Sequence, residues 1–494
     1  MSRDSGGAVE KRPSARARRL RRLLLVVAAV VVVVAGGTIA KLRLQRGEHL
    51  EEMPLLKPGE RTLIVAPHED DESLGCAGYM QQARLAGAEV FVCFMTAGEG
   101  EELGAIWNTK RPPSRPRAFI LLGQKRHKEA ARTLSRIGVG QDHIFFLNYP
   151  NMGVDKIWSA QYWTPAQPWT SPFTRTSRAP FANTYTPQAV FCGSACVSDL
   201  TAIMERVRPA TVFTTHPSDI HPDHWPTYGF AKLALERVRL RQPWAKETRL
   251  FTYVVHRRGW PVPWGYYPRL PLMPPQSLVN LPVNKWLILH LNGAEVRIKN
   301  AMILTYRSQM ARFDLLLRAF ARQTEVFAEV RDIGFPRNIL GYLLSEEPTS
   351  ESRYLHEHPQ ADLASVEASQ SDENLEVTVQ TTRPLSRHYA LLVTLHGVGR
   401  STAASQVITC RYQPERAPEV VVAGGEGPPV ASDALAQAIV QDGQEVRFTF
   451  PLSMFGGVEG LMVDAMTQIQ NRYPDHGVTR MLRWRLPVTP APSR

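Results

Sequence analysis

Cysteine is scarce in this sequence, with five in 494 residues. The even, closely spaced set that marks a small disulfide-stapled domain is missing, so that class of protein is excluded. No C-x2-C pair occurs either, which removes the commonest kind of structural zinc site. Cys192 and Cys196 are close enough to pair in an oxidising compartment, and the sequence leaves open whether they do.

Net positive charge is also small over most of the chain, although the formal net charge of the whole chain is +12. Residues 1–22 contain eight Lys and Arg against Asp4 and Glu10, so this segment alone has a net charge of +6. The remaining chain is therefore only mildly basic. Its charge gives no argument for nucleic-acid binding, and we expect no nucleic-acid partner.

Long apolar runs are lacking except for one. Residues 23–40 contain 18 residues without a charge, and a helix of that length spans roughly 27 Å, close to the thickness of a bilayer core. Basic residues before the run orient the N-terminus towards the cytoplasm. We predict a basic cytoplasmic tail (1–22) and a single-pass transmembrane signal-anchor (23–42), with the rest of the chain outside the cytoplasm; a cleaved signal peptide is the alternative.

Short β-rich runs alternate with helical patterns between residues 60 and 345. This rhythm predicts an α/β domain with a Rossmann-like, doubly wound and mostly parallel sheet. Strands are expected at 62–66, 90–95, 144–147 and 211–215, and helices from about 72 to 87, at 125–137 and at 294–331.

The segments around this domain have a different composition. Residues 43–59 are polar and suit a stalk, and residues 346–372 suit a linker. Beyond the linker, short strand patterns without intervening helices predict a small β-sandwich-like accessory domain over 373–494. These strands are expected at 375–380, 388–395, 406–412, 420–423, 445–450 and 460–464.

Two insertions interrupt the α/β rhythm, at 151–195 and 257–283, and both are rich in proline and aromatic residues. The first is long for a connection, which predicts a functional lid or an elaborated loop. The aromatic stretches 158–173 and 260–267 offer flat faces suited to sugars. They could equally pack the domain or meet a membrane surface.

Two short motifs gather histidine and carboxylate side chains directly after predicted strands. Residues 67–72 read PHEDDE and follow the strand at 62–66, and residues 216–224 read HPSDIHPDH and follow the strand at 211–215. In an open α/β sheet the ligand crevice lies outside the carboxyl ends of the strands. Nitrogen and carboxylate donors fit a catalytic zinc with one open coordination position.

Each motif has a simpler interpretation when taken alone. Aspartate is favoured at a helix N-cap, which would explain the acidic residues of the first motif. His221 and His224 could be residues of a surface loop. Both motifs follow predicted strands of one sheet, and this favours a single shared metal site.

The two motifs together resemble the PIG-L/LmbE family of zinc-dependent de-N-acetylases. Residues 96–100 (TAGEG), the pair Arg126-x-x-Glu129 and residues 306–309 (YRSQ) add weaker similarity, and the resemblance covers about 60–345. It implies Zn²⁺, with Fe²⁺ as another candidate, bound by His68, Asp71 and His224. It also implies Asp70 as general base and His221 as general acid.

Further residues are candidates for supporting roles. We group Asp223 with the catalytic residues, because it could fix the tautomer of an imidazole. Arg126 could hold a substrate hydroxyl or carbonyl, although a solvated pair with Glu129 is the simpler interpretation. Surface or solvent-facing positions are expected for Ser308, Gln309, His256, Arg257 and Arg258, and no role is assigned to His216 or Asp219.

Two positions depart from the family pattern. Glu69 stands where the family usually has proline, and it adds a negative charge beside the predicted metal ligands. Asn151 stands where an aspartate would be expected. Glu69 is not an expected ligand, so the chemistry should survive this change, although the added charge could alter metal affinity and metal preference.

The sequence therefore predicts a membrane-tethered zinc N-deacetylase. Its expected substrate is an N-acetylglucosamine-type sugar of a glycan or glycolipid outside the cytoplasm, as the resemblance implies. One alternative is a zinc amidase that acts on another amide, such as a larger acyl group. The other is a non-catalytic glycan-binding envelope protein. The presence of the ligands and of the acid and base argues against it; these residues are His68, Asp70, Asp71, His221 and His224.

Overall fold

The structure is a computed structural model, and it describes residues 50–109, 116–334, 342–346, 358–371, 373–400, 406–424, 432–469, 472–476 and 480–483. Residues 51–494 form one compact unit. The predicted cytoplasmic tail (1–22) and signal-anchor (23–42) lie outside the described residues. Within the described ranges, no helix is both long and apolar enough to cross a membrane.

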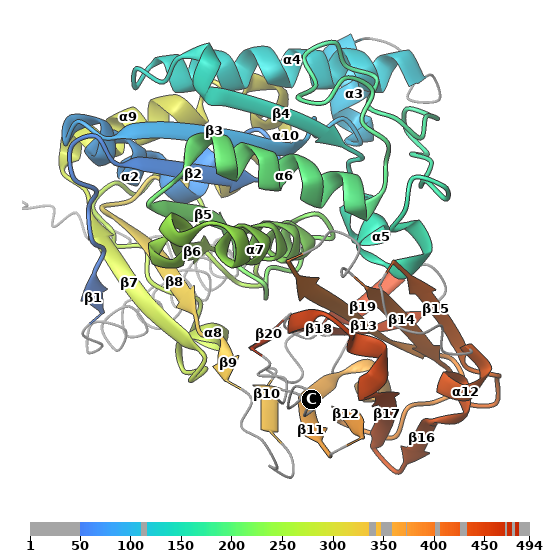
Figure 1. The fold of residues 1–494 in the computed structure, drawn as a ribbon. Coiled ribbons are helices and arrows are strands. Elements are labelled where there is room, and N and C mark those ends of the chain that lie inside the picture. The colour runs from blue at the N-terminus through green and yellow to red at the C-terminus, as the bar shows by residue number, and fades with distance from the viewer. Residues whose placement is uncertain are drawn as a thin grey trace, which may run out of the picture. The chain divides into compact units, whose positions relative to one another are not determined.

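An eight-stranded sheet forms the centre of the α/β part, in the order β1-β7-β8-β6-β5-β2-β3-β4 (Figure 1). Its middle is parallel, as predicted, and β7 and β8 pair antiparallel at one side. The strands are β1 (Glu51–Glu52), β2 (Arg61–Ala66), β3 (Glu89–Thr96), β4 (Ile144–Tyr149), β5 (Thr211–Thr215), β6 (Arg249–Tyr253), β7 (Asn284–His290) and β8 (Thr324–Val330).

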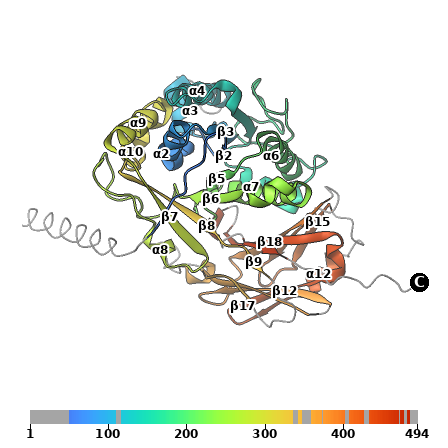
Figure 2. The ribbon, with the colours of Figure 1, turned by 60° about the vertical axis from the view of Figure 1, so that its left-hand side comes forward.

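Helices cover both faces of this sheet, which explains why β2 and β5 are apolar without alternation. Figure 2 shows α2, α4, α9 and α10 on one side and α6 and α7 on the other. The helices are α2 (Asp71–Leu85), α3 (Glu102–Thr109), α4 (Pro116–Ser135), α5 (Val154–Trp158), α6 (Gly193–Val207), α7 (His224–Arg241), α8 (Gln276–Val279), α9 (Gly293–Ile303) and α10 (Arg307–Arg318).

The order of the strands places the ligand crevice at the carboxyl ends of β2 and β5. From β2 the chain proceeds outwards to β3 and β4, and it then returns to form β5 on the opposite side of β2. Helix α2 follows β2 on one face of the sheet, whereas α7 follows β5 on the other (Figure 2). Such a reversal is where open α/β sheets bind ligands. Both histidine motifs follow these two strands.

The single helix predicted over 294–331 is wrong. Helix α9 ends at Ile303, α10 begins at Arg307, and residues 324–330 form strand β8. The apolar pattern did not predict this strand, because its second residue, Glu325, is charged although it is fully buried. Its carboxylate lies 2.6 Å from the buried Lys299 Nζ of α9, and this ion pair allows a charge inside the core.

The C-terminal part contains two antiparallel-rich sheets around a shared apolar core that includes Val377, Leu391 and Phe448. Strand β11 lies inside the segment predicted as a linker. The strands are β9 (Ile333–Gly334), β10 (Tyr342–Glu346), β11 (Leu363–Gln370), β12 (Asn374–Thr381), β13 (Ala390–Gly399), β14 (Val407–Tyr412), β15 (Glu419–Ala423), β16 (Ile439–Asp442), β17 (Glu445–Pro451), β18 (Val458–Ile469), β19 (Arg472–His476) and β20 (Arg480–Arg483), with helix α12 (Ser432–Gln437).

The two parts share buried contacts. His396 of β13 stacks on Trp158 of α5 with ring centroids 3.7 Å apart, and it meets Trp163 at 5.0 Å. Val398 and Met462 belong to the same core cluster as these two tryptophans. Trp158 and Trp163 are therefore core residues, and this part of the first insertion packs the domain instead of presenting a sugar platform.

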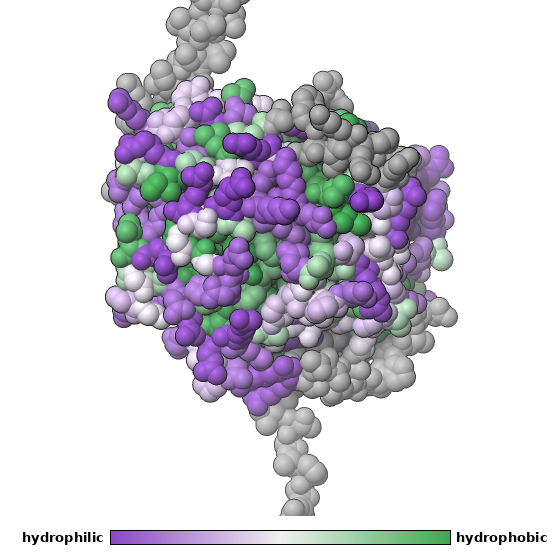
Figure 3. Space-filling model, turned by 90° about the horizontal axis from the view of Figure 1, so that it is seen from above, coloured by the Kyte–Doolittle hydropathy of each residue, from purple (hydrophilic) through white to green (hydrophobic). Residues whose placement is uncertain are grey.

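The cysteines lie in the core of the protein. All five cysteines are described, and each is buried and free, so Cys192 and Cys196 form no disulfide. The face seen from above in Figure 1 is largely hydrophilic, with separate apolar patches (Figure 3).

Candidate active site

Three donor atoms converge at the carboxyl ends of β2 and β5. The Asp71 Oδ2 atom lies 3.2 Å from His68 Nδ1 and 3.3 Å from His224 Nε2, and the two nitrogens are 3.1 Å apart. Ligand atoms about 2.0–2.1 Å from a tetrahedral zinc lie roughly 3.3–3.4 Å from one another. The three residues predicted as metal ligands are therefore brought together, and their donor atoms fit such an ion.

A carboxylate supports each of the two histidines from behind. His68 Nε2 lies 3.0 Å from Asp223 Oδ2, and His224 Nδ1 lies 3.3 Å from Asp219 Oδ2. This arrangement fixes the tautomer and the orientation of each ring, and leaves the opposite nitrogen for a metal. The structure thus places Asp223 behind a ligand, and it gives Asp219 the matching position that sequence reasoning missed.

Backbone donors hold Asp223 in turn. Its Oδ2 accepts hydrogen bonds from Met152 N at 2.8 Å and from Asn151 Nδ2 at 2.9 Å. Its Oδ1 accepts from Gly153 N and Val154 N, both at 3.2 Å. Because α5 begins here, the carboxylate also complements the helix dipole. The loop after β4 is therefore part of the site.

Asn151 is suited to this place by having both a donor and an acceptor. Its Nδ2 donates to Asp223, and its Oδ1 accepts from Gly100 N at 2.9 Å. An ionised aspartate here would lack the donor and would place a second negative charge beside Asp223. The departure from the family pattern has a physical reason in this chain.

Asp70 lies at the N-cap position of α2, but its side chain makes no capping bond in the described structure. It accepts instead from Arg126 Nη2 at 3.3 Å. The N-cap interpretation of the first motif therefore fails for this carboxylate, which lines the cavity beside the ligands. Burial raises the pKa of Asp70 to about 7, against the charge of Arg126, so Asp70 can exchange a proton near neutral pH.

Arg126 is only 4% exposed, so the solvated pair with Glu129 is wrong. Its Nη2 donates to Glu69 O at 3.0 Å, and its Nε lies 3.3 Å from Glu69 Oε2. A Cβ at Gly98, where φ is +57°, would collide with this guanidinium. Burial raises the pKa of Glu69 to about 8, and Arg126 opposes the shift. Arg126 thus offsets part of the cost of burying the Glu69 carboxyl group.

The candidate ligand His68 binds a proton more tightly than an ordinary histidine, whereas Asp71 is held in its ionised form. Burial alone would lower the pKa of His68, but its bonds to Asp223 and Asp71 raise that pKa to about 10. Burial alone would raise the pKa of Asp71, but the adjacent His224 and His68 hold it well below its usual range. A metal must displace the proton of His68 to bind there.

His221 faces both histidine ligands, with ring centroids 4.8 Å from His68 and 4.7 Å from His224. Its Nδ1 accepts from Asp223 N at 3.1 Å, so the neutral ring has its proton on Nε2. Burial and the nearby His224 lower the pKa of His221 well below its usual range. The ring therefore offers an Nε2–H donor to the cavity.

Sequence reasoning missed His256, which was expected to face solvent. Its ring lies 4.6 Å from that of His224 and 5.0 Å from that of His221, and it lines the cavity. Its backbone N–H donates to Asp219 Oδ2 at 2.9 Å. Donor atoms of Asp71, His224 and His256 lie within 4.8 Å of one another and could also hold a metal. Arg257 is also buried, whereas Arg258 is exposed.

The surface positions predicted for Ser308 and Gln309 are also wrong, because both residues are buried. Ser308 Oγ donates to Glu129 Oε2 at 2.5 Å, and the Tyr306 hydroxyl donates to Glu72 Oε1 at 2.6 Å. The two weaker motifs, Arg126-x-x-Glu129 and residues 306–309, are thus in contact through Ser308 and Glu129. Together with the bond from Tyr306 to Glu72, this contact attaches the start of α10 to α4 and to α2. His216 stacks on Trp286 with centroids 5.7 Å apart and packs the core.

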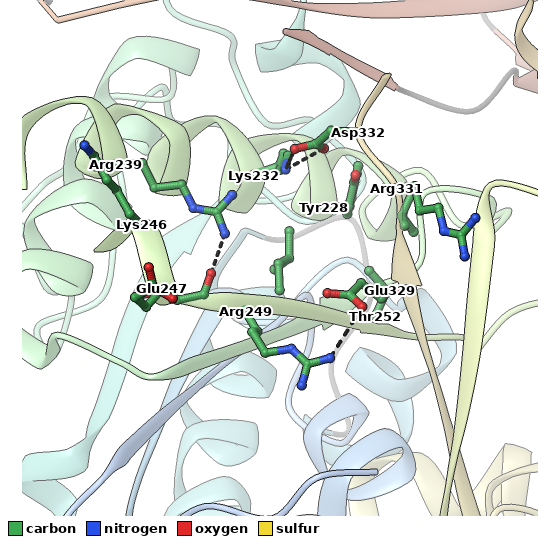
Figure 4. A pocket seen from close by; sticks show the side chains of 13 residues that line it. Tyr228, Lys232, Arg239, Lys246, Glu247, Arg249, Thr252, Glu329, Arg331 and Asp332 are labelled. Carbon is green, nitrogen blue, oxygen red and sulfur yellow. Dashed lines mark hydrogen bonds and ion pairs between the residues drawn. The ribbon is translucent and has the colours of Figure 1, made fainter. Parts of the chain in front are cut away.

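A cavity of about 280 Å³ opens over these residues. The ligands His68 and Asp71 and the catalytic candidates Asp70 and His221 line it, and apolar residues of α10 form part of its wall. A larger hollow of about 510 Å³ lies elsewhere, between α7, β6 and the end of β8. Its Lys232 pairs with Asp332 and its Arg249 with Glu329 (Figure 4), and no described residue of the metal site lines it.

Comparison with known proteins gives one family and several solved structures. Residues 63–235 match the family model described as PIG-L: GlcNAc-PI de-N-acetylase. No curated protein matches the chain.

Three solved structures illustrate the structural similarity. The chain is similar to the N,N'-diacetylchitobiose deacetylase of Pyrococcus horikoshii, with 19% identity, 54% of this chain and 82% of that one covered, and a TM-score of 0.33. It is similar to the A40926 pseudoaglycone deacetylase Dbv21, with 16% identity, 55% and 97% covered, and a TM-score of 0.34. It is also similar to the 4-carboxy-2-hydroxymuconate hydratase GalB of Pseudomonas putida, with 14% identity, 57% and 100% covered, and a TM-score of 0.34.

Proposed function

Because residues 63–235 form a PIG-L family domain, we propose that this protein is a metal-dependent hydrolase that removes the N-acetyl group from an N-acetylglucosamine-type sugar of a glycan or glycolipid. One observation carries the proposal. The donor atoms of His68, Asp71 and His224 lie 3.1–3.3 Å apart, and both histidines are supported by carboxylates.

In this proposal His68, Asp71 and His224 hold Zn²⁺, or another divalent metal such as Fe²⁺. When bound, such a metal lowers the pKa of water and polarises an amide carbonyl. Asp70 accepts the proton of the attacking water, and Arg126 orients the carboxylate of Asp70 through the 3.3 Å contact. The leaving amine takes up the proton that Asp70 accepted from water, and the neutral His221 ring directs its Nε2–H into the cavity, where it donates a hydrogen bond to the reacting group.

We also propose that the reaction takes place outside the cytoplasm. The support is the sequence of residues 23–42, whose length and flanking charge favour a signal-anchor with a cytoplasmic N-terminus. The substrate would then be a glycan or glycolipid that meets a membrane-tethered enzyme.

The test is release of free amine from N-acetylglucosamine substrates by the full-length protein in detergent, with and without Zn²⁺. Asp70→Asn removes the base and keeps the size of the side chain, so we expect a loss of about 10²–10⁴-fold in rate. Asp142→Asn is the matched control, because the Asp142 carboxylate is largely exposed and does not line the cavity.

Other outcomes distinguish the alternatives. Bound zinc without turnover would direct the search to other amides. If neither zinc binding nor turnover is found, the enzyme proposal is contradicted and a glycan-binding protein is favoured. Equal rates for Asp70→Asn and Asp142→Asn would remove Asp70 from the mechanism.

A further inference from the structure

Helix α10 contributes four side chains to the catalytic cavity: Gln309, Phe313, Leu316 and Leu317. Their spacing of four, three and one residues places them on one face of the helix. The first turn of α10 is fixed by the bonds of Ser308 to Glu129 and of Tyr306 to Glu72. This face therefore forms a wall of the cavity, anchored at its first turn, and its chemistry changes from polar at Gln309 to apolar one turn later.

Gln309 is a donor without an acceptor. Its side chain is 6% exposed, and its buried Nε2 has no hydrogen-bond partner in the described part of the chain. An unsatisfied buried N–H group costs free energy, so such groups nearly always have a partner in the functional state. Since Gln309 lines the cavity, a hydroxyl or carbonyl oxygen of a bound ligand could supply the missing acceptor.

The apolar part of the wall begins beside the metal ligands. Leu74 lies one turn after Asp70 and Asp71 on α2, and Val255 precedes His256; both are buried and line the cavity. Phe313 and Leu316 of α10 are half-buried and continue this lining. Sugar hydroxyls set against these side chains would lose their hydrogen bonds to water, whereas an apolar chain would gain by burial.

Exposed apolar side chains lie next to the same part of α10. Leu315 is 59% exposed, and its carbonyl accepts from Gly265 N at 2.7 Å. The neighbour of Gly265, Trp264, is 58% exposed, and Tyr267 of the same insertion is also exposed. The second insertion therefore presents apolar surface at the α10 segment that lines the cavity, which suits a chain longer than the cavity itself.

We propose that the substrate is an amino sugar that bears an apolar chain of several carbons close to the scissile amide. Gln309 donates a hydrogen bond to an oxygen of the sugar or amide, and Phe313, Leu316 and Leu317 contact the chain. This inference rests on the proposed function and narrows its substrate class to amphiphilic amino sugars. The chain belongs either to the acyl group or to the aglycone of the sugar.

Two series of substrates distinguish an apolar chain on the acyl group from one on the aglycone. The acyl series runs from N-acetyl- to N-hexanoyl-glucosamine, and the aglycone series from the methyl to the hexyl glycoside of N-acetylglucosamine. With the full-length, zinc-loaded protein, kcat/KM should rise roughly fourfold per methylene in one series, which corresponds to about 0.8 kcal/mol for each buried group. The series in which kcat/KM rises shows whether the apolar chain belongs to the acyl group or to the aglycone.

Variants of the wall test the assignment. Phe313→Gln and Leu316→Gln should each reduce the ratio of kcat/KM between the longest and shortest substrates by about tenfold or more. Leu85→Gln is the matched control, because Leu85 is exposed at the end of α2 and does not line the cavity. A thermal unfolding midpoint close to that of the unmodified protein confirms that each variant is folded.

A flat response in both series, with N-acetylglucosamine still hydrolysed, overturns the inference and leaves the proposed function intact. If no substrate is hydrolysed, the proposed function is contradicted. The inference about the apolar chain is then tested by measuring ligand binding. Calorimetry with the hexyl and methyl glycosides should show tighter binding of the hexyl compound, and Leu316→Gln should remove the difference. Equal binding of both glycosides contradicts the inference.

Discussion

At the scale of single residues, the site is organised by what lies behind each ligand. His68 and His224 each use one ring nitrogen for a carboxylate, so the other is left for a metal. Asp223 also accepts from three backbone N–H groups and from the Asn151 side chain, and Asp219 likewise accepts from three backbone N–H groups. Replacing Asp223 should therefore weaken metal binding, because the carboxylate supports His68 and makes no direct contact with substrate in this proposal.

Asp223→Asn should weaken zinc binding by about 10–100-fold. The amide keeps the volume, but it removes the charge that orients His68 and that attracts the N–H groups of the loop. Competition with a coloured chelator measures the affinity, and Asp142→Asn serves again as the exposed control. An unchanged zinc affinity in Asp223→Asn would show that His68 needs no support.

The grouping of His68, Asp71 and His224 was predictable, whereas the positions of two other site residues were not. His68, Asp71 and His224 each lie within nine residues of the end of a parallel strand, and such ends share one edge of a sheet. Asp219 and His256 meet only because the loops after β5 and β6 lie side by side, joined by the bond from His256 N to Asp219. No spacing in the sequence encodes that contact. The burial of Arg126 was missed for a related reason, because its partner Glu69 lies in another loop.

At the scale of elements, periodicity predicted the parallel strands β2, β3, β4 and β5 and the sandwich strands β12, β13, β14, β15, β17 and β18. It missed β6, which pairs parallel with β5. It failed at β8, where Glu325 breaks the apolar pattern, and the reason is its fully buried ion pair with Lys299 of α9. Two further bonds to Glu325, from Gly78 N and Tyr79 N, tie α2 to the same carboxylate. This pair therefore joins α2, α9 and β8.

Lys299→Met should destabilise the protein by about 3–5 kcal/mol, because it leaves a buried carboxylate without its countercharge. Chemical unfolding at neutral pH measures the change. The control is Lys285→Met, since Lys285 pairs with the exposed Glu51 and a surface pair contributes about 0–1 kcal/mol. Similar decreases in the free energy of unfolding of the two variants would mean that the Lys299–Glu325 pair contributes no more stability than a surface ion pair.

At the scale of the whole molecule, the sandwich and the α/β part share one buried cluster around Trp158 and His396. Strand spacing predicted the sandwich, but a histidine on a strand gives no sign of burial against a distant tryptophan. The predicted signal-anchor lies outside the described residues, so its role in placing the site at a membrane stays a prediction.

His396 should make this junction sensitive to acid. Burial, together with the charge of Arg237, lowers the pKa of His396 well below its usual range, so the folded protein keeps the ring neutral while the unfolded chain binds a proton below about pH 6.5. Its stabilising contribution is complete above pH 6.5 and declines as the pH falls, by up to about 1.4 kcal/mol per pH unit.

His396→Phe keeps an aromatic ring against Trp158 and removes the titration. The free energy of unfolding, measured between pH 7.5 and 5, should fall less steeply in this variant than in the unmodified protein. The exposed His290, changed to Phe, provides the control with an unaltered slope. Identical slopes for His396→Phe and the unmodified protein would contradict a neutral, buried His396.

Anomalous diffraction at the zinc edge, from crystals of the zinc-loaded protein, would show whether His68, Asp71 and His224 hold the catalytic metal. We expect one strong peak about 2.0–2.2 Å from His68 Nδ1, Asp71 Oδ2 and His224 Nε2, with Asp70 and His221 beside it and not coordinated. A peak bound by other residues, or no peak at full zinc loading, would contradict this assignment.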